Sequence, residues 1–241
     1  MTKSLAVFDF DRTIVNGDSD ATIINSLKEK NPPPEWDSEN YDWTPYMDNV
    51  FEHAYSAGMS QDHILDCIAS MPPTPGVEEL ITTLDARGWD VLVITDANSV
   101  FVDHWFKTHG LKSCITSVIT NPASWQRGRL YISPCARAAG CPRCPDNLCK
   151  AAELRRWRTG RSYDRLVYVG DGRNDYCPAT TLSEDAIVFP RRGYPLHDLI
   201  KKTLASPSPQ VVAKVVPWDT CHTITHELFP KDADSSESTV H

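Results

Sequence analysis

The 241-residue sequence has no apolar run approaching the roughly 20 residues that a membrane-spanning helix needs. The first acid, Asp9, comes so early that it leaves no room for the apolar region of a signal peptide. Basic residues are also few, since 24 lysines and arginines stand against 32 aspartates and glutamates, for a net charge of −8. We therefore expect a cytosolic (cytoplasmic) protein without a membrane or nucleic acid partner.

Two phosphate-binding fingerprints are absent from the sequence. There is no G-x-x-x-x-G-K-[ST] loop, which argues against a P-loop nucleotide hydrolase. The segment Gly170-Asp171-Gly172 begins like the dinucleotide motif G-x-G-x-x-G, but Asp175 stands where the third glycine would be. A carboxylate at that place would repel a pyrophosphate unless a metal ion intervened.

A disulfide framework is not expected either, because the eight cysteines of a cytosolic chain this long are better read as free thiols or metal ligands. Four of them follow the spacing C-x5-C-x2-C-x4-C, namely Cys135, Cys141, Cys144 and Cys149. A lone C-x2-C pair is a weak zinc signal, so packed thiols are favoured, with zinc as the alternative. The others are read as scattered, mostly buried residues: Cys67, Cys114, Cys177 and Cys221.

What the sequence does contain is an apolar run at residues 5–8 that ends on two carboxylates, Asp9 and Asp11. Such a run is typical of a strand buried on both faces of a parallel sheet. Residues i and i+2 of a strand point the same way, so both acids are expected on one side of its carboxyl end. Two close carboxylates repel unless a cation lies beside them; a solvated strand end is the alternative without chemistry.

Strands and helices alternate through most of the chain. Apolar runs predict strands at residues 91–94, 114–120, 166–169 and 186–189, with a last short run at 211–216. Helical spacing predicts helices at residues 77–84, 99–109, 150–158 and 197–204. Residues 121–149 are expected to be irregular. This rhythm predicts an α/β fold with a doubly wound, mostly parallel sheet.

One segment, residues 17–73, interrupts the alternation with helical patterns alone. It predicts a small all-helical insertion after the first strand, whose first helix is capped by Ser19 or Asp20. The predicted division is thus a core of residues 1–16 and 74–230 and a helical cap of residues 17–73. The remaining residues, 231–241, are rich in Asp, Ser and Glu and are expected to be disordered.

Acidic residues follow three of the predicted strands, at the point where each strand stops. Asp9 follows the first strand, Asp96 comes after Thr95 at the end of the second, and Asp171 and Asp175 follow the fourth. Parallel strands end along one edge of a sheet, so these side chains are expected to converge. Oxygen ligands alone favour a hard ion, and Mg²⁺ is the expected cofactor.

The residues Asp9-Phe10-Asp11-Arg12-Thr13, then Thr95, Lys150 and Gly170-Asp171-Gly172-Arg173-Asn174-Asp175, resemble the four motifs of the haloacid dehalogenase superfamily of phosphatases in order and spacing. A narrower resemblance is to the phosphoethanolamine/phosphocholine phosphatases and the related pyridoxal-phosphate phosphatases. It rests on residues 16–20, 95–98, 141–150, 175–178 and 189–195. The resemblance spans nearly the whole chain except the tail. It implies a haloacid dehalogenase-like core with a cap, and a Mg²⁺-dependent phosphomonoesterase.

The resemblance also implies roles for individual residues. Asp9 would be the nucleophile that forms an aspartyl phosphate, and Asp11 the general acid and base. Thr95 and Lys150 would hold the phosphoryl oxygens. The metal site would comprise Asp9, the backbone carbonyl of Asp11, Asp171, and Asp175 as a further ligand or as an orienting residue.

Asp20 and Asp96 match positions that, in the narrower group, meet the non-phosphate end of the substrate. Two acids can attract a cationic head group, which favours phosphoethanolamine or phosphocholine over pyridoxal phosphate, pyrophosphate or another small ester. Trp36, Tyr41 and Trp43 can add an aromatic face, although packing of the insertion is the favoured interpretation of these rings. A non-catalytic metal- or phosphometabolite-binding protein and a phosphotransferase remain the other classes, and oligomeric state stays open.

Overall fold

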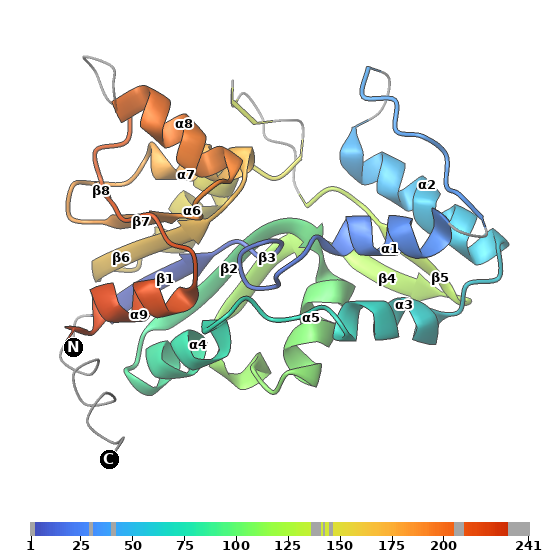
Figure 1. Cartoon of the computed structure of the whole chain (residues 1–241), viewed down its shortest axis with the longest axis horizontal. Helices are drawn as coiled ribbons and strands as arrows, with labels where there is room; N and C mark the ends of the chain where they lie inside the picture. Colours follow the sequence, from blue (N-terminus) through green and yellow to red (C-terminus); the bar gives the residue numbers. More distant parts are fainter. Residues whose placement is uncertain are drawn as a thin grey trace.

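A computed structural model describes residues 3–28, 31–39, 42–135, 141, 143–144, 147–204 and 210–230. Tyr41 and the tail predicted to be disordered lie outside these residues. A six-stranded parallel sheet in the order β3-β2-β1-β6-β7-β8 runs through the chain (Figure 1). Its strands are β1 (Lys3–Phe8), β2 (Asp90–Asn98), β3 (Ser117–Asn121), β6 (Tyr163–Gly170), β7 (Ile187–Pro190) and β8 (Lys214–Val215).

Helices cover both faces of this sheet because its central strands are apolar on both sides. Ala6 and Phe8 face one apolar cluster, whereas Leu5 and Val7 face another. The first cluster includes residues of α4 (Val77–Ala86), α5 (Ser99–Thr108) and α9 (Cys221–Leu228). The second includes residues of α6 (Lys150–Arg158), α7 (Tyr176–Ala179) and α8 (Pro195–Leu204). Figure 1 shows the two groups on opposite sides of the strands, which confirms the doubly wound prediction.

The chain reverses its direction of travel across the sheet at β1. From β1 it proceeds through β2 to β3, and it then returns to pair β6 with the free side of β1. The pairing continues past the end of β1, since the backbone N–H of Asp9 donates to the carbonyl of Val169 at 3.0 Å. Open α/β sheets bind ligands at the carboxyl ends of such a reversal.

The insertion after β1 contains α1 (Ser19–Lys28), α2 (Trp43–Ser56) and α3 (Gln61–Ala69), so it is helical as predicted. The expected cap of α1 was wrong. Asp18, and neither Ser19 nor Asp20, accepts the bond from the free backbone N–H of Ala21, at 2.8 Å. This frees the side chains of Ser19 and Asp20 for other contacts.

The prediction of irregular structure over residues 121–149 was wrong in its first half. Strands β4 (Ala123–Gln126) and β5 (Arg129–Ile132) form an antiparallel hairpin beside the helical insertion (Figure 1). Arg127 and Gly128, between them, both have positive φ, at 51° and 86°, which suits the tight turn of a two-residue hairpin. An ion pair of 2.9 Å joins Arg129 to Asp48 of α2. The division into a core of residues 1–16 and 74–230 and a cap of residues 17–73 remains a prediction. It assigns the hairpin to the core, although the hairpin contacts α2 of the insertion.

Smaller departures concern element ends and short elements. The strand expected at 114–120 is preceded by a 3-10 turn, η1 (Lys112–Cys114), and a second one, η2 (Arg173–Asp175), precedes α7. The short helices α7 and α9 were not predicted, and only two residues of the run at 211–216 form a strand. Within the described ranges, no helix is both long and apolar enough to cross a bilayer.

Candidate active site

The chain makes one tight turn directly after β1. The carbonyl of Phe10 accepts bonds from the backbone N–H groups of Thr13, Ile14 and Val15, at 3.3, 2.8 and 3.1 Å. Arg12 adopts a left-handed backbone with φ of 55°, which a non-glycine residue rarely does. Strained backbone of this kind persists where the surrounding structure imposes it, often at a functional site. The turn sends Asp9 and Asp11 in different directions.

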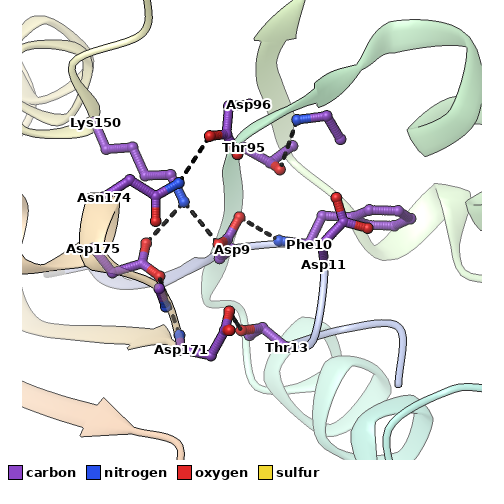
Figure 2. Close-up of polar contacts among 12 residues, drawn as sticks. Asp9, Phe10, Asp11, Thr13, Thr95, Asp96, Lys150, Asp171, Asn174 and Asp175 are labelled. Atoms are coloured by element: carbon purple, nitrogen blue, oxygen red, sulfur yellow. Dashed lines mark hydrogen bonds and ion pairs between the residues drawn. The ribbon is translucent and has the colours of Figure 1, made fainter. Parts of the chain in front are cut away.

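Asp9 lies in a buried cluster with Asp171 and Asp175, whose oxygens come within 4.8 Å of one another. Lys150, the first residue of α6, extends into this cluster (Figure 2). Its Nζ lies 2.8 Å from Oδ2 of Asp9 and 2.8 Å from Oδ1 of Asp175. The side chain of this lysine is only 1% exposed, so its ammonium group interacts with these two carboxylates rather than with water.

Asp175 uses both of its oxygens within the protein. Oδ1 accepts from the Tyr168 hydroxyl at 2.7 Å as well as from Lys150, and Oδ2 accepts from the backbone N–H groups of Asp171 at 3.1 Å and Gly172 at 2.9 Å. A Cβ at Gly170 would come within 2.5 Å of the Asp175 carboxyl group, so glycine leaves the room that this carboxylate occupies. Asp175 is thus placed to orient the loop after β6.

Charges in the cluster do not balance. Burial and then the charge of Asp175 raise the pKa of Asp9 well above its usual range, against the opposing charge of Lys150. The same two causes raise the pKa of Asp171 to about 7. Burial alone would lower the pKa of Lys150, but the charges of Asp175 and Asp9 raise it instead. The three carboxylates carry more negative charge than the one ammonium group offsets. They offer oxygen ligands only, which fits a hard divalent cation such as Mg²⁺.

Asp11 does not join this cluster, contrary to the expectation that both acids lie on one side. Its Oδ1 accepts from the backbone N–H of Ser19 at 2.7 Å and its Oδ2 accepts from the Ser19 hydroxyl at 3.0 Å. Figure 2 shows its carboxylate turned away from Asp171 and Asp175. Burial and the charges of Asp18 and Asp20 raise the pKa of Asp11 well above its usual range, although the bonds from Ser19 oppose this.

Thr95 and Asp96 lie at the end of β2, next to the cluster (Figure 2). Thr95 is fully buried, and its Oγ1 accepts from the backbone N–H of Ala97 at 3.2 Å, which leaves the hydroxyl proton for another acceptor. Asp96 accepts from the side-chain amide of Asn174 at 3.0 Å. This bond connects the end of β2 with η2, which follows β6.

A pocket of about 650 Å³ opens above these residues, and most of its charged lining is acidic. Asp20 lies in its wall, where Oδ2 accepts from Nε1 of Trp43 at 2.7 Å. Oδ1 of Asp20 is buried and faces no hydrogen-bond partner among the described residues. Burial raises the pKa of Asp20 to about 7, although the Trp43 bond opposes it. Trp36 also lines the pocket and meets Trp43 edge to face at 4.8 Å between ring centroids.

Comparison with known proteins identifies the chain. A family described as "Putative Phosphatase" matches residues 4–231. The chain belongs to this phosphatase family. It is 35% identical to the pyridoxal phosphate phosphatase of Rattus norvegicus, over 94% of this chain and 98% of that protein. It is 33% identical to the phosphoethanolamine/phosphocholine phosphatase of Homo sapiens, over 90% of this chain and 84% of that protein.

Solved structures give this phosphatase the haloacid dehalogenase fold. A substrate-bound phosphoserine phosphatase matches with a TM-score of 0.59 and 17% identity, over 94% of this chain and 99% of that one. The predicted superfamily is therefore confirmed, and the chain is a phosphoric monoester hydrolase.

Further residues of the phosphatase contact the predicted site residues through their side chains, and no role in the site was predicted for them. Thr13 donates to Asp171 at 3.3 Å, and Ser19, Tyr168 and Asn174 bind Asp11, Asp175 and Asp96. Thr13 and Asn174 stand inside quoted motifs and could have been found there. Ser19 resembled a helix cap, and Tyr168 resembled a packing residue in the middle of a strand.

Proposed function

We propose that the protein is a Mg²⁺-dependent phosphomonoesterase that forms an aspartyl phosphate on Asp9, with phosphoethanolamine and phosphocholine as substrates. One observation carries the proposal. A buried cluster of Asp9, Asp171 and Asp175, neutralised in part by Lys150, opens into an acidic pocket with tryptophans in its wall. The cluster suits a dianionic phosphate with its metal, whereas the pocket suits a cationic head group.

In the proposed first step, a carboxylate oxygen of Asp9 attacks phosphorus in line with the ester oxygen. A phosphorus–oxygen bond to Asp9 forms as the ester bond breaks. The Thr95 hydroxyl and Nζ of Lys150 donate to the phosphoryl oxygens and hold them in place. Asp11, whose pKa is raised, gives its proton to the leaving oxygen.

The second step releases inorganic phosphate. Water attacks the phosphorus of the aspartyl phosphate and loses a proton to Asp11, which regains the form it had at the start. The bond between phosphorus and Asp9 breaks, so the carboxylate is restored. The backbone N–H and the hydroxyl of Ser19 donate to the two carboxyl oxygens of Asp11. These bonds hold Asp11 away from the acidic cluster, where it is free for this proton transfer.

Asp9, Asp171 and the backbone carbonyl of Asp11 would hold the metal, with Asp175 as the orienting residue. When bound, Mg²⁺ offsets the charge between the phosphate dianion and the carboxylates and fixes their alignment. Removal of divalent ions with EDTA is expected to abolish phosphate release, and added Mg²⁺ to restore it. Activity that persists fully in EDTA, with Mg²⁺ verified as absent, would contradict the proposal.

Substitution of Asp11 by asparagine tests its role as proton donor. We expect kcat for phosphocholine to fall by about 10²–10⁴-fold, since general acid–base help is of that size. The rate of the first-turnover burst of leaving-group release should fall much less for p-nitrophenyl phosphate than for phosphocholine, because p-nitrophenolate leaves without a proton. An equal fall in the burst rate for the two substrates would instead indicate that Asp11 acts only through structure.

The substrate assignment rests on Asp20. Its unpartnered Oδ1 and the neighbouring Trp36 and Trp43 offer a carboxylate and aromatic rings to an ammonium group. We expect Asp20→Asn to raise KM for phosphocholine by about tenfold, equivalent to 1.4 kcal/mol, and to leave KM for glycerol phosphate unchanged. Asp185→Asn, an exposed aspartate on the loop before β7, serves as the matched control.

The pH dependence of KM follows from the same residue. With a pKa of about 7, Asp20 is charged above neutral pH and becomes neutral as the pH falls below it. KM for phosphocholine should therefore rise between pH 8 and pH 6 relative to KM for glycerol phosphate, whose phosphate titrates in the same way. In Asp20→Asn this ratio should not change with pH; a ratio that still rises in the variant would refute the assignment.

Pyridoxal phosphate is the alternative substrate, since a pyridine ring can stack on the tryptophans and a relative of 35% identity carries that name. Comparison of kcat/KM across pyridoxal phosphate, phosphocholine, phosphoethanolamine and pyrophosphate decides between them. The same assay tests the two other classes. A binding protein would release no phosphate, and a phosphotransferase would pass the phosphoryl group to an added alcohol.

A further inference from the structure

Four thiols meet outside the active site. The Sγ atoms of Cys141, Cys144, Cys149 and Cys177 all lie within 4.8 Å of one another. Cys141 and Cys149 are 3.7 and 4.0 Å from Cys177. All are free rather than disulfide-bonded. The set differs from the one that the spacing suggested, because Cys177, expected to be an isolated residue, belongs to it.

Cys135, by contrast, is not part of the cluster. Its backbone N–H donates to Oδ1 of Asn121 at 2.9 Å, and its side chain packs against the apolar cluster beneath α6, α7 and α8. Sequence spacing grouped Cys135 with Cys141, Cys144 and Cys149. The fold instead brings in Cys177, which lies 28 residues beyond Cys149. The cluster thus has four thiols without Cys135.

The separations fit a tetrahedral metal cage. Sulfur atoms bound to zinc at about 2.3 Å in a tetrahedron stand about 3.8 Å apart, whereas a disulfide holds them at about 2.05 Å. The backbone N–H of Arg143, in the Cys141-x2-Cys144 turn, also donates to the Cys141 sulfur. Cys149 is the N-cap of α6, so the start of that helix fixes its backbone.

Packing alone gives this part of the chain little stability. Within the described residues, the small cluster around the four thiols adds only Ala151 and Ala152, with no larger apolar side chain. Such a cluster buries little apolar area, so it contributes little to holding its loops together. A metal bound by four protein ligands would supply that stability directly.

We propose that Cys141, Cys144, Cys149 and Cys177 bind one structural Zn²⁺ ion as a closed tetrahedral site. Each thiol loses its proton to solvent as its sulfur binds the ion, and no coordination position remains open for substrate. Soft sulfur ligands select zinc here, while the oxygen ligands of the active site select a hard ion. The protein would therefore carry two metals of different kinds.

The ion would also join two segments of the active site. Cys149 immediately precedes Lys150, and Cys177 follows Asp175 by two residues. Lys150 and Asp175 themselves form an ion pair of 2.8 Å. A zinc ion at the four sulfurs would therefore fix the start of α6 against the start of α7 and so position Lys150 for the phosphoryl group.

The test is metal analysis of the untagged full-length protein, purified under reducing conditions without chelators. Mass spectrometry of the metal content should give one zinc per chain, retained after a brief EDTA wash that removes Mg²⁺. Cys177→Ser and Cys144→Ser should lose the zinc, and Cys135→Ser, the matched control, should keep it. Because the measurement is zinc content, it stands apart from phosphate release and from the Mg²⁺ requirement.

A second measurement covers the case in which a variant fails to fold. Unfolded wild-type protein refolded with Co²⁺ should show intense visible d–d bands and thiolate charge transfer, the signature of a tetrahedral thiolate site. Folded wild-type protein without zinc after growth in zinc-supplemented medium would overturn the proposal. So would equal loss of zinc in Cys135→Ser, or an intact mass that reveals disulfides among the four cysteines.

Discussion

Replacement of Asp9 by asparagine is expected to reduce kcat for every phosphomonoester by about 10⁴-fold or more, because the variant lacks the oxygen that bonds to phosphorus. The free energy of unfolding should change little. The variant loses the 2.8 Å contact with Lys150, but Lys150 keeps its ion pair with Asp175. Burial disfavours the charged form of Asp9, and asparagine keeps the 2.7 Å bond from the backbone N–H of Phe10. Steady-state phosphate release and thermal unfolding measure the two effects.

A trapping experiment sharpens this prediction. Wild-type protein quenched in acid during turnover should carry one extra phosphoryl group on the peptide that contains Asp9, and the asparagine variant should carry none. Asp185→Asn should label and turn over like the wild type. Turnover in Asp9→Asn above a hundredth of the wild-type value would remove Asp9 from the role of nucleophile.

Asp175→Asn, unlike Asp9→Asn, should clearly lower the free energy of unfolding. The amide would present its NH2 group to Nζ of Lys150 or to the backbone N–H groups of Asp171 and Gly172, all of which are donors. Loss of one partner of a buried ion pair costs about 3 kcal/mol, and loss of an orienting group costs about 10–100-fold in metal affinity or activity. Denaturant unfolding and a Mg²⁺ titration of activity measure them.

Tyr168→Phe provides the graded control, since it removes only the hydroxyl bond of 2.7 Å to Asp175. Tyr168→Phe should lower the free energy of unfolding by about 1 kcal/mol. Its Mg²⁺ affinity should stay closer to the wild-type value than that of Asp175→Asn. If Asp175→Asn unfolds at the wild-type denaturant concentration and keeps its Mg²⁺ dependence, then the carboxylate is not the orienting group that its contacts indicate.

The sheet was predictable because its strands are short apolar runs with clear ends, and the parallel arrangement brings those ends together. Asp9 and Asp171 meet for that reason, whereas Lys150, which begins a helix, was expected there only from the resemblance. The hairpin of β4 and β5 was missed because each strand has four residues and the turn, Arg127-Gly128, lacks the usual Asn-Gly signal. Its stability comes from contact with α2, which a local pattern does not contain.

The details of the site were less predictable than its membership. Alternation along a strand placed Asp11 beside Asp9, but the chain leaves the strand at Phe10 and Arg12 turns left-handed, so that rule no longer applies. Cys177 was not grouped with the other thiols because only the fold brings α7 to the start of α6. Pairwise contacts between distant segments decide such positions, and no spacing reports them.

Tyr168 is wholly enclosed among the apolar side chains beneath α7 and α8, yet its hydroxyl binds Asp175. The interior and the reaction centre therefore share one side chain. Volume-conserving substitutions that most protein interiors tolerate would, in this layer, tilt the ring and with it the carboxylate of Asp175. Substitutions beneath these two helices are consequently expected to change turnover as well as folding.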